Sequence, residues 1–126
     1  MTRPVHFEIH GSDPAALVTF YGALFGWQFE RYNDDPYWMA ATGAGTGIDG
    51  AIMGRRGPAP AEDGPVMGAT IVMEVDDIDA ALDKGVSLGA RPAADKMAVP
   101  GMGWAAYQKD PDGNVYGMFQ PDEGAK

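Results

Sequence analysis

Three polar residues near the amino terminus have the types and the spacing to do chemistry together. His6, Glu8 and His10 occupy alternate positions, and the positions before and between them are apolar. This alternation is typical of a β-strand with one buried face, so residues 5–10 are predicted to form a strand. On its polar face, two imidazoles and a carboxylate could exchange protons with a ligand or bind a metal ion. The residues that would face the core are Val5, Phe7 and Ile9.

Each polar residue also has a structural interpretation. His6 could act as a metal ligand or as an acid or base, or it could be a structural histidine hydrogen-bonded to Glu8 or Thr70. Glu8 could serve as a general base, or it could be the structural partner of His6 or Arg91. His10 lies nearer the end of the strand and is expected to contact solvent. We predict His6 and Glu8 as the catalytic pair.

Composition limits the classes of function. The chain has 126 residues, enough for one domain with its own core, and it has no cysteine, which excludes disulfides and thiolate metal sites. Its formal net charge of −9 repels nucleic acid and anionic membrane surfaces. The first residues lack a secretory signal pattern, and no apolar run is long enough to cross a bilayer. We therefore expect a cytoplasmic protein whose partner is neither nucleic acid nor membrane.

A helix is predicted directly after the first strand. Asp13 suits the N-cap position, Pro14 suits the first helical position, and Gly26 suits a left-handed terminator. The apolar residues between them recur with helical spacing, at Leu17, Phe20, Tyr21 and Leu24. Further β-prone segments follow at residues 27–32, 37–42 and 47–53.

The same order of elements recurs half a chain length later. An acidic turn at Asp76 and Asp77 is predicted to lead into a second helix through Ile78, which ends at Gly89. The predicted strands of this half are residues 69–75, 91–99, 104–109 and 115–120. Glycine and proline dominate residues 55–68, approximately, and predict a connector between the halves.

Two βαβββ modules joined by a connector describe this order of elements. Module one covers about residues 1–54 and module two about residues 69–126. The predicted fold class is therefore α+β, with a single domain over residues 1–126.

Three segments carry a resemblance to a known family. They are VHFEIHGSDPAALVTFYGALFGWQFE, VDDIDAALDKGVSLGA and GWAAYQKDPDGNVYGMFQPD. Through them the chain resembles the vicinal oxygen chelate superfamily of glyoxalases, bleomycin-resistance proteins and extradiol dioxygenases, and in particular its small lactoylglutathione-lyase-related branch. The resemblance implies that each module forms a curled mixed sheet, a half-barrel, and that the two half-barrels surround a cavity with the helices outside. It also implies a homodimer.

The resemblance further implies where a metal ion would bind. In the metal-dependent members, the first and last strands of each module each supply one His, Gln or Glu ligand to a divalent ion. His6 matches the first of these positions, whereas the others hold Thr70, Gly117 and Asp49, which do not fit the pattern. A glyoxalase I mechanism is therefore not supported. Two residues of the first strand could still share a different metal site. A divalent metal cofactor therefore stays an alternative, although we expect no tightly bound ion.

The expected partner is a small organic molecule. The residues predicted to contact it are His6, Glu8, Thr70, Trp104 and Phe119. One hypothesis is an enzyme of lyase, isomerase or dioxygenase type, with unknown substrate, that uses His6 and Glu8. The alternative is sequestration of a drug or metabolite without chemistry, as the resemblance to bleomycin-resistance proteins implies. Fold alone does not decide between these hypotheses, because one fold can host unrelated chemistries.

Overall fold

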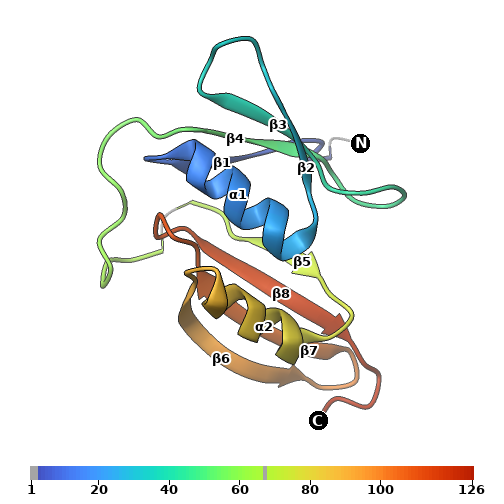
Figure 1. Ribbon diagram of the computed structural model, residues 1–126. Coiled ribbons are helices and arrows are strands. Elements are labelled where there is room, and N and C mark those ends of the chain that lie inside the picture. The colour runs from blue at the N-terminus through green and yellow to red at the C-terminus, as the bar shows by residue number, and fades with distance from the viewer. Residues whose placement is uncertain (1–2, 67) are drawn as a thin grey trace. The chain divides into compact units, whose positions relative to one another are not determined.

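The computed structural model describes residues 3–66 and 68–126. The chain divides into two compact units, Met1–Ala59 and Pro60–Lys126. Each unit has the element order strand, helix and three strands, with its own four-stranded mixed sheet (Figure 1). The predicted α+β class and the two βαβββ modules are confirmed, while the single-domain organisation stays a prediction. Within the residues described, no helix is long and apolar enough to cross a membrane.

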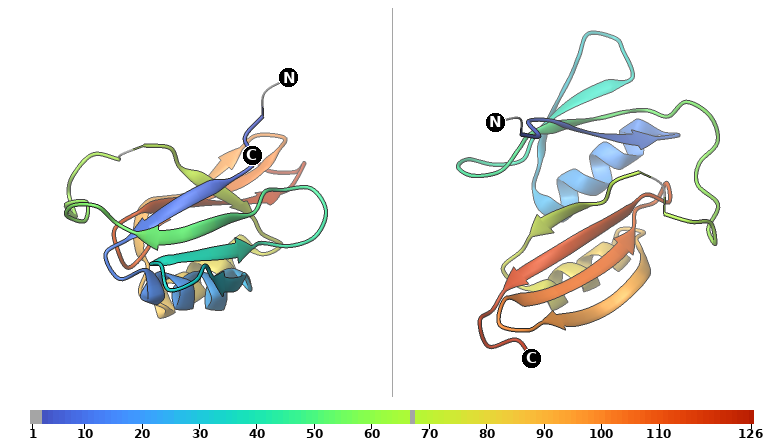
Figure 2. Two further views of the ribbon diagram at one scale, coloured as in Figure 1. Left: turned by 90° about the horizontal axis from the view of Figure 1, so that it is seen from above. Right: turned by 180° about the vertical axis from the view of Figure 1, so that it is seen from behind.

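The first unit is one mixed sheet with a helix along one of its faces (Figure 2). Its strand order is β1-β4-β3-β2, in which β1 runs parallel to β4 and the other neighbours are antiparallel. The elements are β1 (Phe7–Gly11), α1 (Pro14–Phe25), β2 (Gln28–Arg31), β3 (Tyr37–Ala41) and β4 (Gly50–Gly54).

Helix α1 is specified locally at both ends, as predicted. Asp13 accepts a hydrogen bond from the Ala16 amide at 3.3 Å, and proline occupies the first turn. Gly26 follows the helix with φ of 75°, a left-handed conformation that costs glycine little. The buried residues of the helix are those expected from the helical spacing, Leu17, Phe20, Tyr21 and Leu24. Its apolar face is therefore directed to the core of the first unit.

One core prediction for the first strand is wrong. Ile9 is buried as expected, but Val5 is 79% exposed. The reason is that the strand begins two residues later than predicted, because the first residue paired with β4 is Phe7, opposite Gly50. Val5 lies before this pairing, so the alternation with period two overestimates the length of the strand.

The second unit repeats this arrangement. Its strand order is β5-β8-β7-β6, in which β5 runs parallel to β8 and the other neighbours are antiparallel. The elements are β5 (Ile71–Glu74), α2 (Ile78–Ser87), β6 (Arg91–Val99), β7 (Gly103–Lys109) and β8 (Val115–Pro121).

The N-cap of α2 is the second of the two adjacent aspartates. Asp77 accepts a hydrogen bond from the Ala80 amide at 3.0 Å, so of the two aspartates in the predicted turn it is Asp77 that caps the helix. A tertiary contact selects this start, because the side-chain oxygen of Gln120 in β8 accepts a hydrogen bond from the Ile78 amide at 2.9 Å. This contact occupies one of the free amides of the first turn.

A buried hydrogen-bond network joins α2 to its sheet. Gln108 in β7 and Tyr116 in β8 are each 2% exposed. The Tyr116 hydroxyl donates to Gln108 Oε1 at 2.6 Å, and Gln108 Nε2 donates to the backbone oxygen of Leu82 in α2 at 3.1 Å. Burial raises the pKa of the Tyr116 phenol, with a smaller contribution from the charge of Asp110. The network fixes α2 over these two strands.

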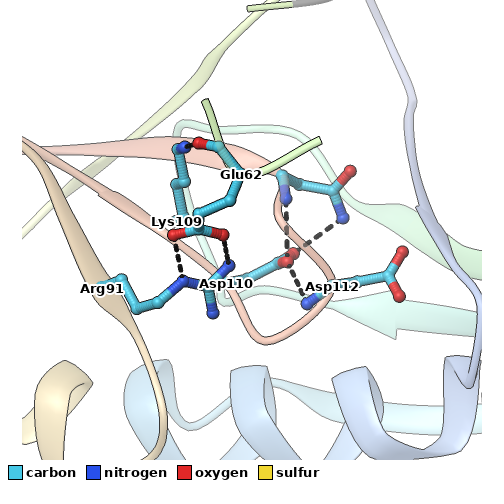
Figure 3. A network of polar contacts seen from close by, with 6 residues as sticks. Glu62, Arg91, Lys109, Asp110 and Asp112 are labelled. Atoms are coloured by element: carbon cyan, nitrogen blue, oxygen red, sulfur yellow. Dashed lines mark hydrogen bonds and ion pairs between the residues drawn. The ribbon is translucent and has the colours of Figure 1, made fainter. Parts of the chain in front are cut away.

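The turn between β7 and β8 is built around Asp110, which is fully buried. Asp110 Oδ1 accepts hydrogen bonds from the amides of Asp112 and Asn114 at 2.8 and 3.0 Å, and Oδ2 accepts one from Asn114 Nδ2 at 2.8 Å. These contacts satisfy donors that the turn leaves without backbone partners. The buried carboxylate is thus a structural group (Figure 3).

Glu62, in the predicted connector, is attached to the second unit beside this turn (Figure 3). Its carboxylate accepts two hydrogen bonds from the Arg91 guanidinium, at 2.7 and 2.8 Å, and its backbone oxygen accepts one from Lys109 Nζ. The bonds to Arg91 lower the pKa of Glu62, and they raise the pKa of Arg91. Because the side chains of Arg91 and Glu62 are 38% and 63% exposed, solvent weakens this ion pair, and it positions the connector more than it stabilises the fold.

Candidate functional site

The candidate site lies on the face of the first sheet opposite α1. Ile9 is buried toward the helix, so the neighbouring residues Glu8 and His10 point to the other face. The register places Glu8 beside Ala51, which pairs with Met39. It places His10 beside Met53, which pairs with Tyr37. Paired residues share a face, so these six side chains belong to one surface.

His6, Tyr37 and Glu8 are joined by hydrogen bonds, and we name them the polar triad. Tyr37 Oη donates to Glu8 Oε2 at 2.7 Å, and His6 Nε2 lies 2.9 Å from the same Tyr37 oxygen. His6 Nε2 and Glu8 Oε2 are 3.6 Å apart. The side chains of His6 and Glu8 are each 42% exposed, so a ligand in solution can reach them.

The direction of these bonds follows from the single hydroxyl proton of Tyr37. Because that proton is donated to Glu8, the bond to His6 requires His6 Nε2 to carry a hydrogen and to donate it to Tyr37 Oη. The polar triad is therefore an ordered chain that runs from His6 through Tyr37 to Glu8. Partial burial, the hydrogen bond to Glu8 and the negative charge of Glu8 raise the pKa of Tyr37 to about 12. Tyr37 is a neutral hydrogen-bonding phenol at neutral pH.

This assignment predicts a pH dependence. An ordinary tyrosine ionises near pH 10, whereas Tyr37 keeps its proton until its pKa of about 12. Because the folded-state pKa lies above the unfolded value, its contribution to stability is complete below about pH 10 and is lost as the pH rises through about 12. We expect Tyr37→Phe to leave the tyrosinate absorbance step near pH 10 unchanged and to remove amplitude only at higher pH. Loss of amplitude near pH 10 would contradict the assignment.

Tyr37 is the site residue that the sequence did not reveal. It was predicted as the first residue of a strand, but 31 positions separate it from His6 and 29 from Glu8. Only the register of β3 on β4 and of β4 on β1 brings them together. The sequence showed only a tyrosine at the start of a predicted strand, next to a polar turn. Such a position does not identify the partners of the hydroxyl group.

The other predicted contact residues lie in the second unit, and two of them are on opposite faces of its sheet. Thr70 directly precedes β5. Trp104 shares the α2 face with Gln108, since both stand at alternate positions of β7, and its ring lies 4.8 Å from Lys96 Nζ. Phe119 pairs with Ala105, the neighbour of Trp104, so it points away from α2. Trp104 and Phe119 therefore do not line one face together.

The residues at the family's metal positions do not fit a divalent ion. Gly117 has no side chain, and a Cβ there would lie 2.8 Å from Tyr107 Cε1 and 3.0 Å from Val72 Cγ2, so the aromatic ring occupies the space of a ligand. Asp49 Oδ1 accepts hydrogen bonds from the amide and hydroxyl of Thr42 at 2.8 and 3.1 Å. Among residues 3–66 and 68–126, no three His, Cys, Asp or Glu side chains are grouped so that they could hold a metal. These positions therefore do not supply a set of ligands for a divalent ion.

Solved structures share this fold at low sequence identity. A fosfomycin resistance protein, FosX, from Listeria monocytogenes has a TM-score of 0.75 and 15% identity, with 97% of this chain and 93% of that chain covered. A glyoxalase/bleomycin resistance protein/dioxygenase family enzyme from Burkholderia phytofirmans PsJN has a TM-score of 0.72 and 16% identity, with 93% and 97% covered. TioX from Micromonospora sp. ML1 has a TM-score of 0.70 and 15% identity, with 96% and 100% covered. These similarities concern the fold.

Sequence comparison identifies the family. A comparison with curated proteins finds no match. The model of the Glyoxalase/Bleomycin resistance protein/Dioxygenase superfamily, however, matches residues 3–117. This span includes both helices, seven complete strands and the polar triad. The predicted resemblance to the vicinal oxygen chelate proteins is thereby confirmed, and the chain belongs to the Glyoxalase/Bleomycin resistance protein/Dioxygenase superfamily.

Proposed function

We propose that this protein binds a small organic molecule on the face of the first sheet opposite α1, and that Glu8 and His6 exchange protons with the bound molecule. The observation that carries the proposal is the ordered chain from His6 through Tyr37 to Glu8. A carboxylate and an imidazole held by a shared tyrosine are oriented before a ligand arrives, which reduces the entropy cost of positioning them. The proposal does not include the glyoxalase I reaction, because the metal positions are not filled with suitable ligands.

The surroundings of the polar triad suit an organic ligand. Met39 is 51% exposed on the same face, and Met53 is partly exposed between His10 and Tyr37 in the register. Thioether side chains adapt to apolar groups of different shape. A molecule with one polar and one apolar end can therefore place its polar end at Glu8 or His6 and its apolar end over the methionines.

A thermal-shift screen of small metabolites and drugs tests the binding function. We expect some compounds to raise the unfolding temperature of the wild type and to have weaker effects on Tyr37→Phe, because that variant removes the hydroxyl that orients both other groups. Tyr32→Phe is the matched control, since Tyr32 is 54% exposed and lies outside the polar triad. If no compound binds, or if both variants respond alike, the proposed site is wrong.

Deuterium exchange separates catalysis from sequestration. A bound ligand with an acidic C–H should gain deuterium in D2O when Glu8 takes the proton and returns a deuteron. We expect Glu8→Gln to slow this exchange measured by NMR. Binding without exchange in the wild type would assign the protein to sequestration and would reject the proton-transfer role of Glu8.

We also propose that the protein is a cytoplasmic homodimer, as the family resemblance implies. A mass of two chains by light scattering at micromolar concentration is expected. A mass of one chain, about 13.3 kDa, would contradict the homodimer.

A further inference from the structure

The polar triad has an unequal supply of hydrogen-bond donors and acceptors. The hydroxyl proton of Tyr37 is used by Glu8, and the Nε2 hydrogen of His6 is used by Tyr37. In the part of the chain that the structure describes, Glu8 Oε1 and His6 Nδ1 have no hydrogen-bond partner. In a neutral imidazole with hydrogen on Nε2, Nδ1 is an acceptor. Both ends of the polar triad therefore offer acceptors, and neither end offers a donor.

The charge of the site, like its free hydrogen-bond acceptors, favours a ligand that carries donors and a positive charge. Glu8 contributes a carboxylate, while Tyr37 stays neutral. The formal net charge of the whole chain is −9, so the surrounding potential attracts cations and repels anions. A ligand that presents an acceptor or a negative charge would leave these acceptors unsatisfied, which is costly on partial desolvation.

From these observations we infer that the ligand is an organic cation with N–H donors, an ammonium or amidinium compound with an apolar substituent. Its charged group donates to Glu8 Oε1 or to His6 Nδ1, and its substituent lies over Met39 and Met53. This inference rests on the proposed function, because it assumes that the polar triad is the ligand site. It specifies the chemical class of ligand, which the family assignment leaves open.

Three probes of similar size test the inference. Benzylammonium, benzyl alcohol and benzoate share a phenyl ring and differ in the charge and donors of the polar group. Their affinities are measured by NMR titration at about pH 8, where an ordinary imidazole is neutral. We expect benzylammonium to bind about tenfold more tightly than benzyl alcohol, and benzoate to bind most weakly, because the ion pair with a half-exposed carboxylate contributes modestly.

Two variants with the same change of charge locate the preference. In Glu8→Gln the side-chain oxygen can still accept the Tyr37 hydrogen bond, but the free position becomes an NH2 donor, so the preference for benzylammonium should disappear. Glu30→Gln is the control. Glu30 lies in the same cross-strand row on the same face, linked to Glu8 through Met39 and Ala51, roughly 14 Å away at ordinary strand spacing. Glu30→Gln should change each dissociation constant less than about twofold.

The outcomes distinguish this inference from the proposed function. If benzoate or benzyl alcohol binds as tightly as benzylammonium, the cation inference is wrong, and the proposed function stands as long as Tyr37→Phe weakens binding. If the preference for benzylammonium is lost equally in Glu8→Gln and Glu30→Gln, the net negative charge of the protein causes this preference. The inference is then also wrong. If none of the probes and no compound of the thermal-shift screen binds, both proposals are wrong.

Discussion

Gly85→Ala should destabilise the protein by about 3 kcal/mol, although alanine is the better helix former. Gly85 lies in α2 directly over the buried network of Gln108 and Tyr116. An added Cβ would overlap Gln108 Oε1 and lie 3.1 Å from Tyr116 Oη. Gln108 is 2% exposed and bonded to both Tyr116 and Leu82, so it has no free space into which to move. Relief of the overlap must break these bonds or shift the helix.

Urea unfolding followed by circular dichroism measures this effect. At ordinary values of the denaturant slope, the midpoint should fall by roughly 1 to 3 M. Gly22→Ala in α1 is the matched control, because a Cβ there meets Trp27 O at 3.4 Å and Phe29 Cε2 at 3.6 Å, which are ordinary contacts. This control should stabilise the protein by about 0.5 to 1 kcal/mol through helix propensity. Equal effects of the two substitutions would show that the network does not exclude a Cβ.

Asp110→Ala should cost a similar amount, about 3 kcal/mol. The substitution removes the acceptor of three hydrogen bonds, which are donated by the amides of Asp112 and Asn114 and by the Asn114 side-chain amide. Because Asp110 is fully buried, water cannot replace the carboxylate without rearrangement of the turn. The antiparallel pairing of β7 with β8 depends on this turn, so we expect the loss to appear as a lower midpoint of global unfolding in urea.

Two further variants separate hydrogen bonding from charge. Asp110→Asn keeps an oxygen that can accept from the two backbone amides, so it should cost less than half as much as alanine. Asp63→Ala removes an exposed carboxylate outside the turn and should change the midpoint little. If Asp110→Asn destabilises the protein as much as Asp110→Ala, the two amide bonds to Oδ1 contribute little, and the charge of Asp110 or the bond that Oδ2 accepts from Asn114 Nδ2 matters more.

The sequence predicted features whose determinants are local. Asp13, Pro14 and Gly26 stand next to the backbone groups that they satisfy or the conformation that they permit, so the bounds of α1 followed from residue type. The start of α2 was less certain from sequence because two adjacent aspartates suit the same role. The choice of Asp77 depends on Gln120, which is distant in the chain.

The composition of the site depended on tertiary pairing and could be predicted only in part. The structure brings His6 and Glu8 together, as the alternation near the amino terminus indicated, but it also inserts Tyr37 between them. Strand register determines that insertion, and period-two alternation contains no information about register between distant strands. The same limit explains why Trp104 and Phe119 were predicted as one contact set although their strand positions direct them to opposite faces.

The two units can be compared position by position because the strand pairs that face their helices match. Ile9 pairs with Ile52 between β1 and β4, and Met73 pairs with Met118 between β5 and β8. In each unit, the preceding residue of the first strand is paired in the same way. Glu8 pairs with Ala51 in the first unit, and Val72 pairs with Gly117 in the second unit. By this alignment Val72 is the counterpart of Glu8.

The same alignment extends across each sheet. In the first sheet, His10 pairs with Met53, which pairs with Tyr37. In the second sheet, Glu74 pairs with Phe119, which pairs with Ala105. The residues of the second unit at the positions of the polar triad are therefore Thr70, Val72 and Ala105. The two units therefore share a framework but differ at these positions: the first unit has an acid, an imidazole and a phenol, whereas the second unit has a small hydroxyl and two aliphatic groups. The second unit can therefore serve as a comparison for the first. Introducing the three residues of the polar triad at Thr70, Val72 and Ala105 would measure how much ligand binding these side chains add to a similar backbone.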